Sequence, residues 1–163
     1  MSYKVTPTLA AAMLNALKAQ LDGGRIYIFA GAVPTDASEA LDMVTEHTEL
    51  AELTLNGGGV TGLTFDTTTS ALISKAVAEV WSGLVAFDGF AGPGPGTLTP
   101  TFFRFCESGD DGRGDGAGLA RLQGTVGGPA SAADGRLGSD TLTDNAANTT
   151  GASIFTVSLS SFG

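Results

Sequence analysis

The chain has 163 residues, of which 17 are acidic and 8 are basic, so its formal net charge is -9. This balance argues against nucleic acid and anionic membranes as ligands, because both are bound through clustered Lys and Arg. The single cysteine excludes an intrachain disulfide, and neither a signal peptide nor an apolar run of about 18 residues is recognisable.

The composition is poor in charge and rich in small residues. Charged residues make up 15% of the chain, against a usual ~25%, and there are 24 glycines. A low charge fraction indicates that a partner covers part of the surface, although Thr, Ser, Asn and Gly could also do the solvating. The length favours one folded unit, and we divide it into an N-terminal helix or arm over residues 1–24 and a β-rich domain over residues 25–163.

The first element that the sequence predicts is a helix. Thr6 or Thr8 could cap it, and Pro7 suits a first turn. Gly23 and Gly24 would end it, because glycine accepts the left-handed conformation found at helix ends. One apolar stripe at intervals of four consists of Leu9, Met13, Leu17 and Leu21, widened by Leu14. A short helix of this kind is marginal alone, so we expect it to dock on the domain or on another chain.

Two strands are predicted next, over Arg25–Ala30 and Leu50–Asn56, because both stretches are rich in apolar or alternating residues and end at glycines. The intervening Gly31–Ser38 is a predicted turn, and Glu39–Glu46 is compatible with one short helical turn. Residues 71–87 have both helical spacing and strand-like composition. We favour strand there, because β-branched and aromatic residues dominate.

A hairpin is predicted at the centre of the chain. In an extended Thr101–Cys106, Phe102, Arg104 and Cys106 point to one side and Phe103 and Phe105 to the other. A return strand over 119–126 alternates in the same way. The loop between these strands, Glu107–Gly118, is rich in glycine and acidic residues.

The remaining elements are short. Glycine and proline predict loops over 89–100 and 127–138, polar residues predict a turn over 145–151, and strands are predicted over 62–66, 140–144 and 152–162. Strands joined by short turns, without βαβ alternation, indicate a mainly β fold: an antiparallel β-sandwich, jelly roll or barrel with one N-terminal α-helix.

The sequence offers few groups for catalysis. His47 is the only histidine and has polar neighbours, which predicts a solvated surface position, while Cys106 beside three phenylalanines predicts a buried thiol. No HExxH, paired CxxC, P-loop or GxSxG motif is present. The acidic Glu107–Gly118 loop could offer oxygen atoms to a cation such as Ca²⁺, but its spacing is not that of an EF-hand, and we favour an exposed, flexible tip. We therefore expect no enzyme, no cofactor and no metal ligands.

The order of these elements resembles that of small virion structural proteins of tailed bacteriophages. The resemblance rests on a short N-terminal helix, RIYIFAG with a nearby Pro34, LAELTL, FFRFCESG, RLQGTVGG, LTDN and the final SIFTVSLSSF. Such proteins are similar to this chain in their Gly-, Ala- and Thr-rich composition and in a strand-turn-strand of the form FRF-x-x-SG followed by a QGTVG-type return.

This resemblance implies a protein of the virion, assembled in the host cytoplasm, and most specifically a capsid decoration (cement) protein. The implied partners are the major capsid protein or other virion proteins, and a dimeric or trimeric homo-oligomer. Under this hypothesis the loop over 89–100 and seven residues on the helix and the acidic loop are the contact candidates: Leu9, Met13, Leu17, Asp110, Asp111, Arg113 and Asp115.

Two alternatives stay open. One is a tail, neck or head-spike component of the same kind of particle. The other is a carbohydrate- or receptor-binding jelly-roll module, in which Trp81 and Tyr27 would stack on a sugar beside the acidic loop. Solvent exposure of Trp81 would favour the second alternative.

Overall fold

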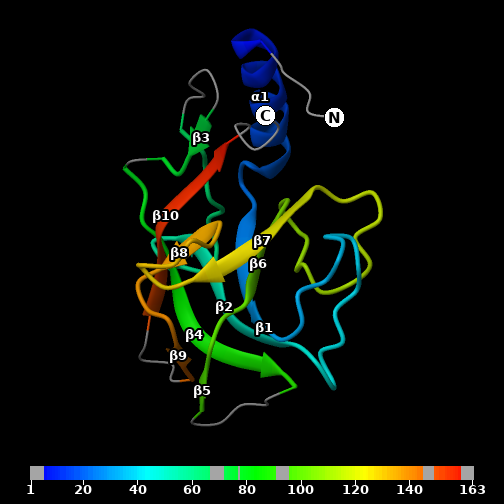
Figure 1. The fold of residues 1–163 in the computed structure, drawn as a ribbon, viewed down its shortest axis with the longest axis vertical. Coiled ribbons are helices and arrows are strands. Elements are labelled where there is room, and N and C mark those ends of the chain that lie inside the picture. Colours follow the sequence, from blue (N-terminus) through cyan, green and yellow to red (C-terminus); the bar gives the residue numbers. More distant parts are fainter. Residues whose placement is uncertain (1–5, 67–71, 77, 91–95, 145–148, 159–163) are drawn as a thin grey trace.

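The computed structural model describes residues 6–66, 72–76, 78–90, 96–144 and 149–158. It confirms a mainly β fold with one N-terminal helix (Figure 1). Helix α1 spans Pro7–Leu21, and the strands are β1 (Arg25–Ala30), β2 (Thr48–Leu55), β3 (Leu72–Ser74), β4 (Trp81–Gly89), β5 (Thr97–Leu98), β6 (Phe102–Cys106), β7 (Arg121–Gly127), β8 (Gly135–Leu137), β9 (Leu142–Thr143) and β10 (Thr149–Ser158). No helix in these ranges is long and apolar enough to cross a bilayer.

The main sheet curls around the core. Its strand order is β3-β10-β4-β2-β1-β6-β7-β8, and β10 also pairs with β8, so the sheet closes between β8 and β10, with β3 at the outer edge of β10. Most pairs are antiparallel, but β7 and β8 run parallel, which makes the sheet mixed. Strands β5 and β9 form a separate small pair. Figure 1 shows the barrel-like curvature of this sheet.

The core fills the inside of this curled sheet. Phe65 stacks on Phe105 with ring centroids 5.1 Å apart, and Trp81 meets Phe105 edge-on at 5.7 Å. Leu14 and Leu21 of α1 belong to the same buried cluster. The predicted division into an arm and a domain stays a prediction, but α1 contributes side chains to the core of the β-rich part.

Helix α1 begins and ends where the sequence predicts. Thr6 is its N-cap, and the Thr6 hydroxyl accepts a hydrogen bond from the Leu9 N–H. The predicted apolar stripe is only partly confirmed: Leu21 and Leu14 are buried and Leu17 packs against the core, whereas Leu9 and Met13 are exposed. The helix is therefore turned so that Ala10, rather than Leu9, faces the rest of the molecule.

Several local predictions need correction. Residues 39–46 form turns without a helix, and strands β5 and β8 lie in stretches predicted as loops. Within the described part of 71–87 the preference for strand is confirmed by β3 and β4, and the last predicted strand is found as β10, which already begins at Thr149. Parts of the predicted loop over 89–100, the turn over 145–151 and the strand over 152–162 lie outside the described residues.

The central hairpin is confirmed, and both of its faces are covered. Strands β6 and β7 pair with Phe103 opposite Gly124, and β1 pairs with the other edge of β6. Phe103 and Phe105 enter the core, whereas Phe102 and Cys106 join Phe29 in a second buried cluster on the outer side of the sheet. Something must cover that outer side, and two loops do so.

Candidate functional site

Two loops form an outer layer over β1, β6 and β7. We call residues 31–47 the cover loop and residues 107–120 the acidic loop. Leu41 of the cover loop is buried in the outer cluster with Phe102 and Tyr27. Backbone hydrogen bonds join the loops directly, from the Leu41 N–H to the Arg113 carbonyl at 2.7 Å and from the Gly116 N–H to the Ser38 carbonyl at 2.8 Å. The acidic loop is thus part of the folded body, contrary to the prediction of a flexible tip.

Arg104, on β6, is the centre of this layer. Its side chain is fully buried. Its Nε donates to Gln123 Oε1 at 2.9 Å, and Nη1 donates to the carbonyls of Glu39 and Gly112 at 2.8 and 2.6 Å. One guanidinium therefore binds the sheet, the cover loop and the acidic loop at once. Burial, followed by the nearby charge of Arg121, lowers the pKa of Arg104.

Arg121, on β7, makes the second connection. Its Nε and Nη2 donate to the two carboxylate oxygens of Asp110 at 2.6 and 2.7 Å, a bidentate pair that is almost wholly buried. Its Nη1 donates to the Gly114 carbonyl at 2.9 Å. Burial raises the pKa of Asp110, but the hydrogen bonds from Arg121 and from the Gly112 N–H outweigh burial, so the pKa lies below its usual value.

Arg113 ties the acidic loop to the neighbouring strands. Its guanidinium forms ion pairs with Glu49 of β2 at 2.9 Å and with Asp88 of β4 at 2.7 Å. Glu49 is buried, and burial raises the pKa of its carboxyl although the charge of Arg113 lowers it. Two of the predicted contact residues, Asp110 and Arg113, thus have partners within the chain.

Asp111 and Asp115 are placed differently. Both are exposed, and each carboxylate accepts one backbone hydrogen bond, from the Arg113 N–H and the Ala117 N–H respectively, at 2.9 Å. Each bond engages only the Oδ1 atom of the carboxylate and holds the local turn. Asp111 and Asp115 are therefore the members of the predicted set on this loop that remain available to a partner.

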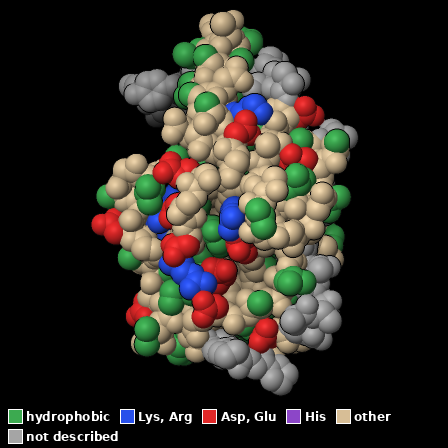
Figure 2. Space-filling model, turned by 180° about the vertical axis from the view of Figure 1, so that it is seen from behind, with side chains coloured by type: hydrophobic (Ala, Val, Ile, Leu, Met, Phe, Trp, Pro, Cys, Tyr) green, Lys and Arg blue, Asp and Glu red, His purple; other side chains and the backbone are tan. Residues whose placement is uncertain are grey.

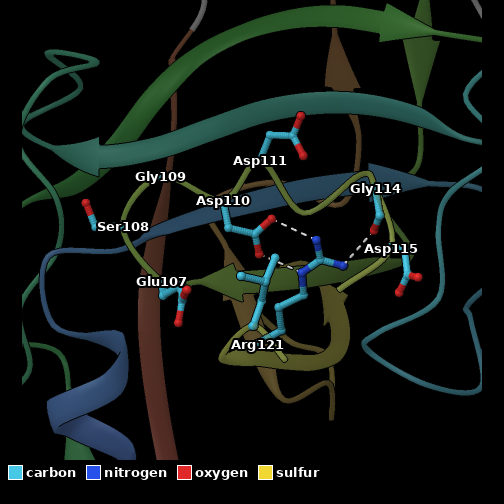
Figure 3. A pocket seen from close by; sticks show the side chains of 9 residues that line it. Glu107, Ser108, Gly109, Asp110, Asp111, Gly114, Asp115 and Arg121 are labelled. Atoms are coloured by element: carbon cyan, nitrogen blue, oxygen red, sulfur yellow. Dashed lines mark hydrogen bonds and ion pairs between the residues drawn. The ribbon is translucent and has the colours of Figure 1, made fainter. Parts of the chain in front are cut away.

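An open pocket of about 500 Å³ lies on the acidic loop. Figure 3 shows Asp110 and Arg121 facing each other in it, while Asp111 and Asp115 point away from that pair. Glu107 accepts the Ala120 N–H at 3.0 Å. Within the described residues no three His, Cys, Asp or Glu side chains are grouped so that they could hold a metal ion. The carboxylates hold backbone turns and an arginine instead of converging on one point.

Comparison with known proteins adds no relative. No family model, no curated protein and no solved structure matches this chain. The chemistry of the site therefore has to be argued from its own residues.

His47 and Cys106 are both buried. The prediction of a solvated His47 is wrong: its Nε2 lies 2.9 Å from the Ala32 carbonyl, and its ring meets Phe102 edge-on. The histidine holds the base of the cover loop. The prediction of a buried Cys106 is confirmed, and burial raises the pKa of its thiol.

The aromatic residues that a sugar site would need are also buried. Trp81 lies in the core, where its Nε1 donates to Glu79 at 2.6 Å, and Tyr27 is covered by the outer layer. Neither ring is free to stack on a ligand. The exposure of Trp81 that would favour a carbohydrate-binding module is absent.

Sequence reasoning missed Arg104 and Arg121, which organise the site. A signal was present, because strand alternation places Arg104 beside Phe102, and Arg121 and Gln123 on the matching face of the next strand. An arginine among phenylalanines on a covered strand must find several acceptors, and the nearby loops supply backbone carbonyls. The helix residues Leu9, Met13 and Leu17 lie on α1 and take no part in this layer.

Proposed function

We propose that this protein is a non-catalytic structural component of a tailed-bacteriophage particle, of the head-decoration type. The observation that carries the proposal is that the three arginines of the outer layer bind groups of the chain itself. Arg104, Arg113 and Arg121 bind carbonyls and carboxylates of the chain itself, and so hold two loops as a fixed outer layer. An outer layer with a fixed shape is suited to binding another protein. Catalysis would require groups that converge on a substrate with usable proton affinities.

The resemblance to small virion proteins supplies the partner class. A protein that stabilises a shell needs a stiff body and a surface that keeps its shape on contact, because ordering a loop at an interface costs free energy. In this chain the exposed Asp111 and Asp115 are held by turns on such a body. We propose that they contact basic groups of the major capsid protein, and that the chain resides in the virion.

Copy number tests the proposal directly. Quantitative mass spectrometry of purified particles should find this chain in hundreds of copies, in proportion to the capsid subunits. A handful of copies would instead indicate a tail, neck or head-spike component. Absence of the chain from purified particles would overturn the proposal of a virion protein altogether.

A binding assay tests the proposed contact. We expect the Asp111→Asn, Asp115→Asn double variant to sediment with decoration-free capsids at least about tenfold more weakly than the wild type. Asparagine can still accept the Arg113 and Ala117 N–H bonds, so the turns persist while the charges are removed. Glu46→Gln, an exposed carboxylate of the cover loop, is the matched control. Equal binding by the double variant and the control would contradict the contact.

A further inference from the structure

Helix α1 has one face on the core and one face in solvent. Ala10, Leu14 and Leu21 are buried, whereas Leu9 is 51% and Met13 is 44% exposed. The helix stands at one end of the molecule, and its first turns project beyond the sheet (Figure 1). Two large apolar side chains one turn apart on a projecting helix form a stripe that water solvates poorly.

The base of this helix is fixed to the body. The Lys18 ammonium donates to the Phe65 carbonyl and pairs with Asp22 at 3.0 Å, and Asp22 accepts the Phe65 N–H at 2.9 Å. Leu63 exchanges backbone hydrogen bonds of 2.8 Å with Gly23 and Gly24 just beyond the helix. The exposed stripe is therefore held in one orientation, and association would order few additional groups.

The charge distribution indicates what can approach this face. Lys18 is the one charged side chain among residues 7–21, and it is tied to Asp22, although the whole chain has a net charge of -9. On the face seen in Figure 2, acidic and basic side chains lie over the body, and none of the described ones is visible at the tip where α1 projects. A partner that binds through opposite charges would contact the body of the molecule and not this face of α1. Two copies of this acidic chain can meet here without placing like charges against each other.

The exposed residues also have the spacing of a helix-packing seam. Leu9, Ala12, Ala16 and Ala19 follow one another at intervals of three, four and three, with Met13 beside them, and all are exposed. The alanines would let a second helix approach closely, since interaxial distance depends on side-chain size at the contact. We infer that this face is a self-association surface, on which α1 of a second copy packs.

The seam is short, and this limits its strength. A fifteen-residue helix offers less than the roughly 800 Å² per partner of a standard stable interface. The free protein is therefore expected to associate reversibly and in a concentration-dependent way. This inference does not depend on the proposed role in a virion, because it concerns the isolated chain.

Analytical ultracentrifugation tests the inference. With rising concentration the wild-type mass should increase from 16.3 kDa toward twice that value. The Leu9→Glu, Met13→Glu variant should remain monomeric, with association weakened at least about tenfold. Val44→Glu, at an 80% exposed apolar residue of the cover loop, should associate like the wild type. Circular dichroism should show that all three are folded.

A cross-link tests the geometry separately. Ala12→Cys should form disulfide-linked dimers on mild oxidation, whereas Val44→Cys should not. The native Cys106 is buried and should not contribute. A wild type that stays monomeric at every concentration would overturn the inference, as would undiminished association of the Leu9→Glu, Met13→Glu variant. If this variant instead lost only its binding to capsids, while the wild type was monomeric, the face would belong to another virion protein and the inference would be wrong.

Discussion

Arg104 is the residue on which the outer layer depends most. It is a buried cation whose direct hydrogen-bond partners are neutral: the Gln123 side chain and carbonyls of residues 36, 39 and 112. Lysine could not replace it, because an ammonium lacks the planar fork that reaches three segments at once. The sequence predicts which way this side chain points. It does not predict the partners, because they lie in a loop that has no regular structure.

The Asp110 and Arg121 pair should contribute strongly to stability. Asp110→Asn leaves a buried arginine without its carboxylate, and we expect a loss of about 3–5 kcal/mol in the free energy of unfolding. Urea denaturation at neutral pH measures it. Asp111→Asn, at the exposed neighbour, should change stability by less than about 0.5 kcal/mol. A small effect of Asp110→Asn would show that the loops are held without this pair.

The same pair predicts a pH dependence. The pKa of Asp110 is lowered in the folded chain, so its contribution is complete above the unfolded value of about 3.9 and is lost as pH falls through the folded pKa. The difference in unfolding free energy between wild type and Asp110→Asn should therefore be constant near neutral pH and shrink below about pH 4. If this difference in unfolding free energy increased as the pH fell, the prediction would be contradicted.

At the scale of helices and strands, the elements that could be predicted are those marked by residues close together in the sequence. The cap of α1, the strand β1 and the β6–β7 pair each depend on residues near one another in sequence, and all three are found. The sequence does not predict strand β8, because β8 pairs in parallel with β7 and antiparallel with the distant β10. Neither pairing is made by a hairpin, so no turn signal marks this strand. The sequence predicts only a turn over 31–38 and a short helical turn over 39–46, because the hydrogen bonds that hold the cover loop come from Arg104 and Gln123, which are distant in the sequence.

Gly83 marks a close approach between β4 and β2. A Cβ at this position would lie 1.9 Å from the Glu52 carbonyl oxygen, which is backbone and cannot turn aside. We expect Gly83→Ala to lower the free energy of unfolding by about 1–3 kcal/mol through strand displacement. Gly114→Ala is the control, because nothing lies within 4 Å of its added Cβ. Equal stability of the two variants in denaturant titrations would argue against this close approach.

At the scale of the whole molecule, helix and sheet share one core. Leu14 packs in the same buried cluster as Trp81 and Phe105. Leu14→Ala should cost about 2–5 kcal/mol, since it leaves a cavity in that cluster. The helical circular dichroism signal and the Trp81 fluorescence should still change in one coincident transition. Loss of the helical signal first, with unchanged Trp81 emission, would mean that α1 folds as a separate arm.

The inward placement of arginines also changes what an approaching molecule meets. Arg104 is buried, and Arg121 and Arg113 lie in ion pairs with acidic side chains, so an approaching molecule meets few free guanidinium groups and a field that follows the net charge of -9. At low ionic strength this field extends tens of ångströms, and at 0.1 M salt it falls off over about 10 Å.

Added salt should therefore act in opposite directions on the two proposed contacts. It should strengthen association between copies through α1, because it screens the mutual repulsion of two acidic bodies around an uncharged seam. It should weaken binding of Asp111 and Asp115 to a basic lattice surface, where attraction is screened. A sedimentation series at rising sodium chloride, with and without capsids, measures both trends, and trends of the same sign would contradict this assignment of the two surfaces.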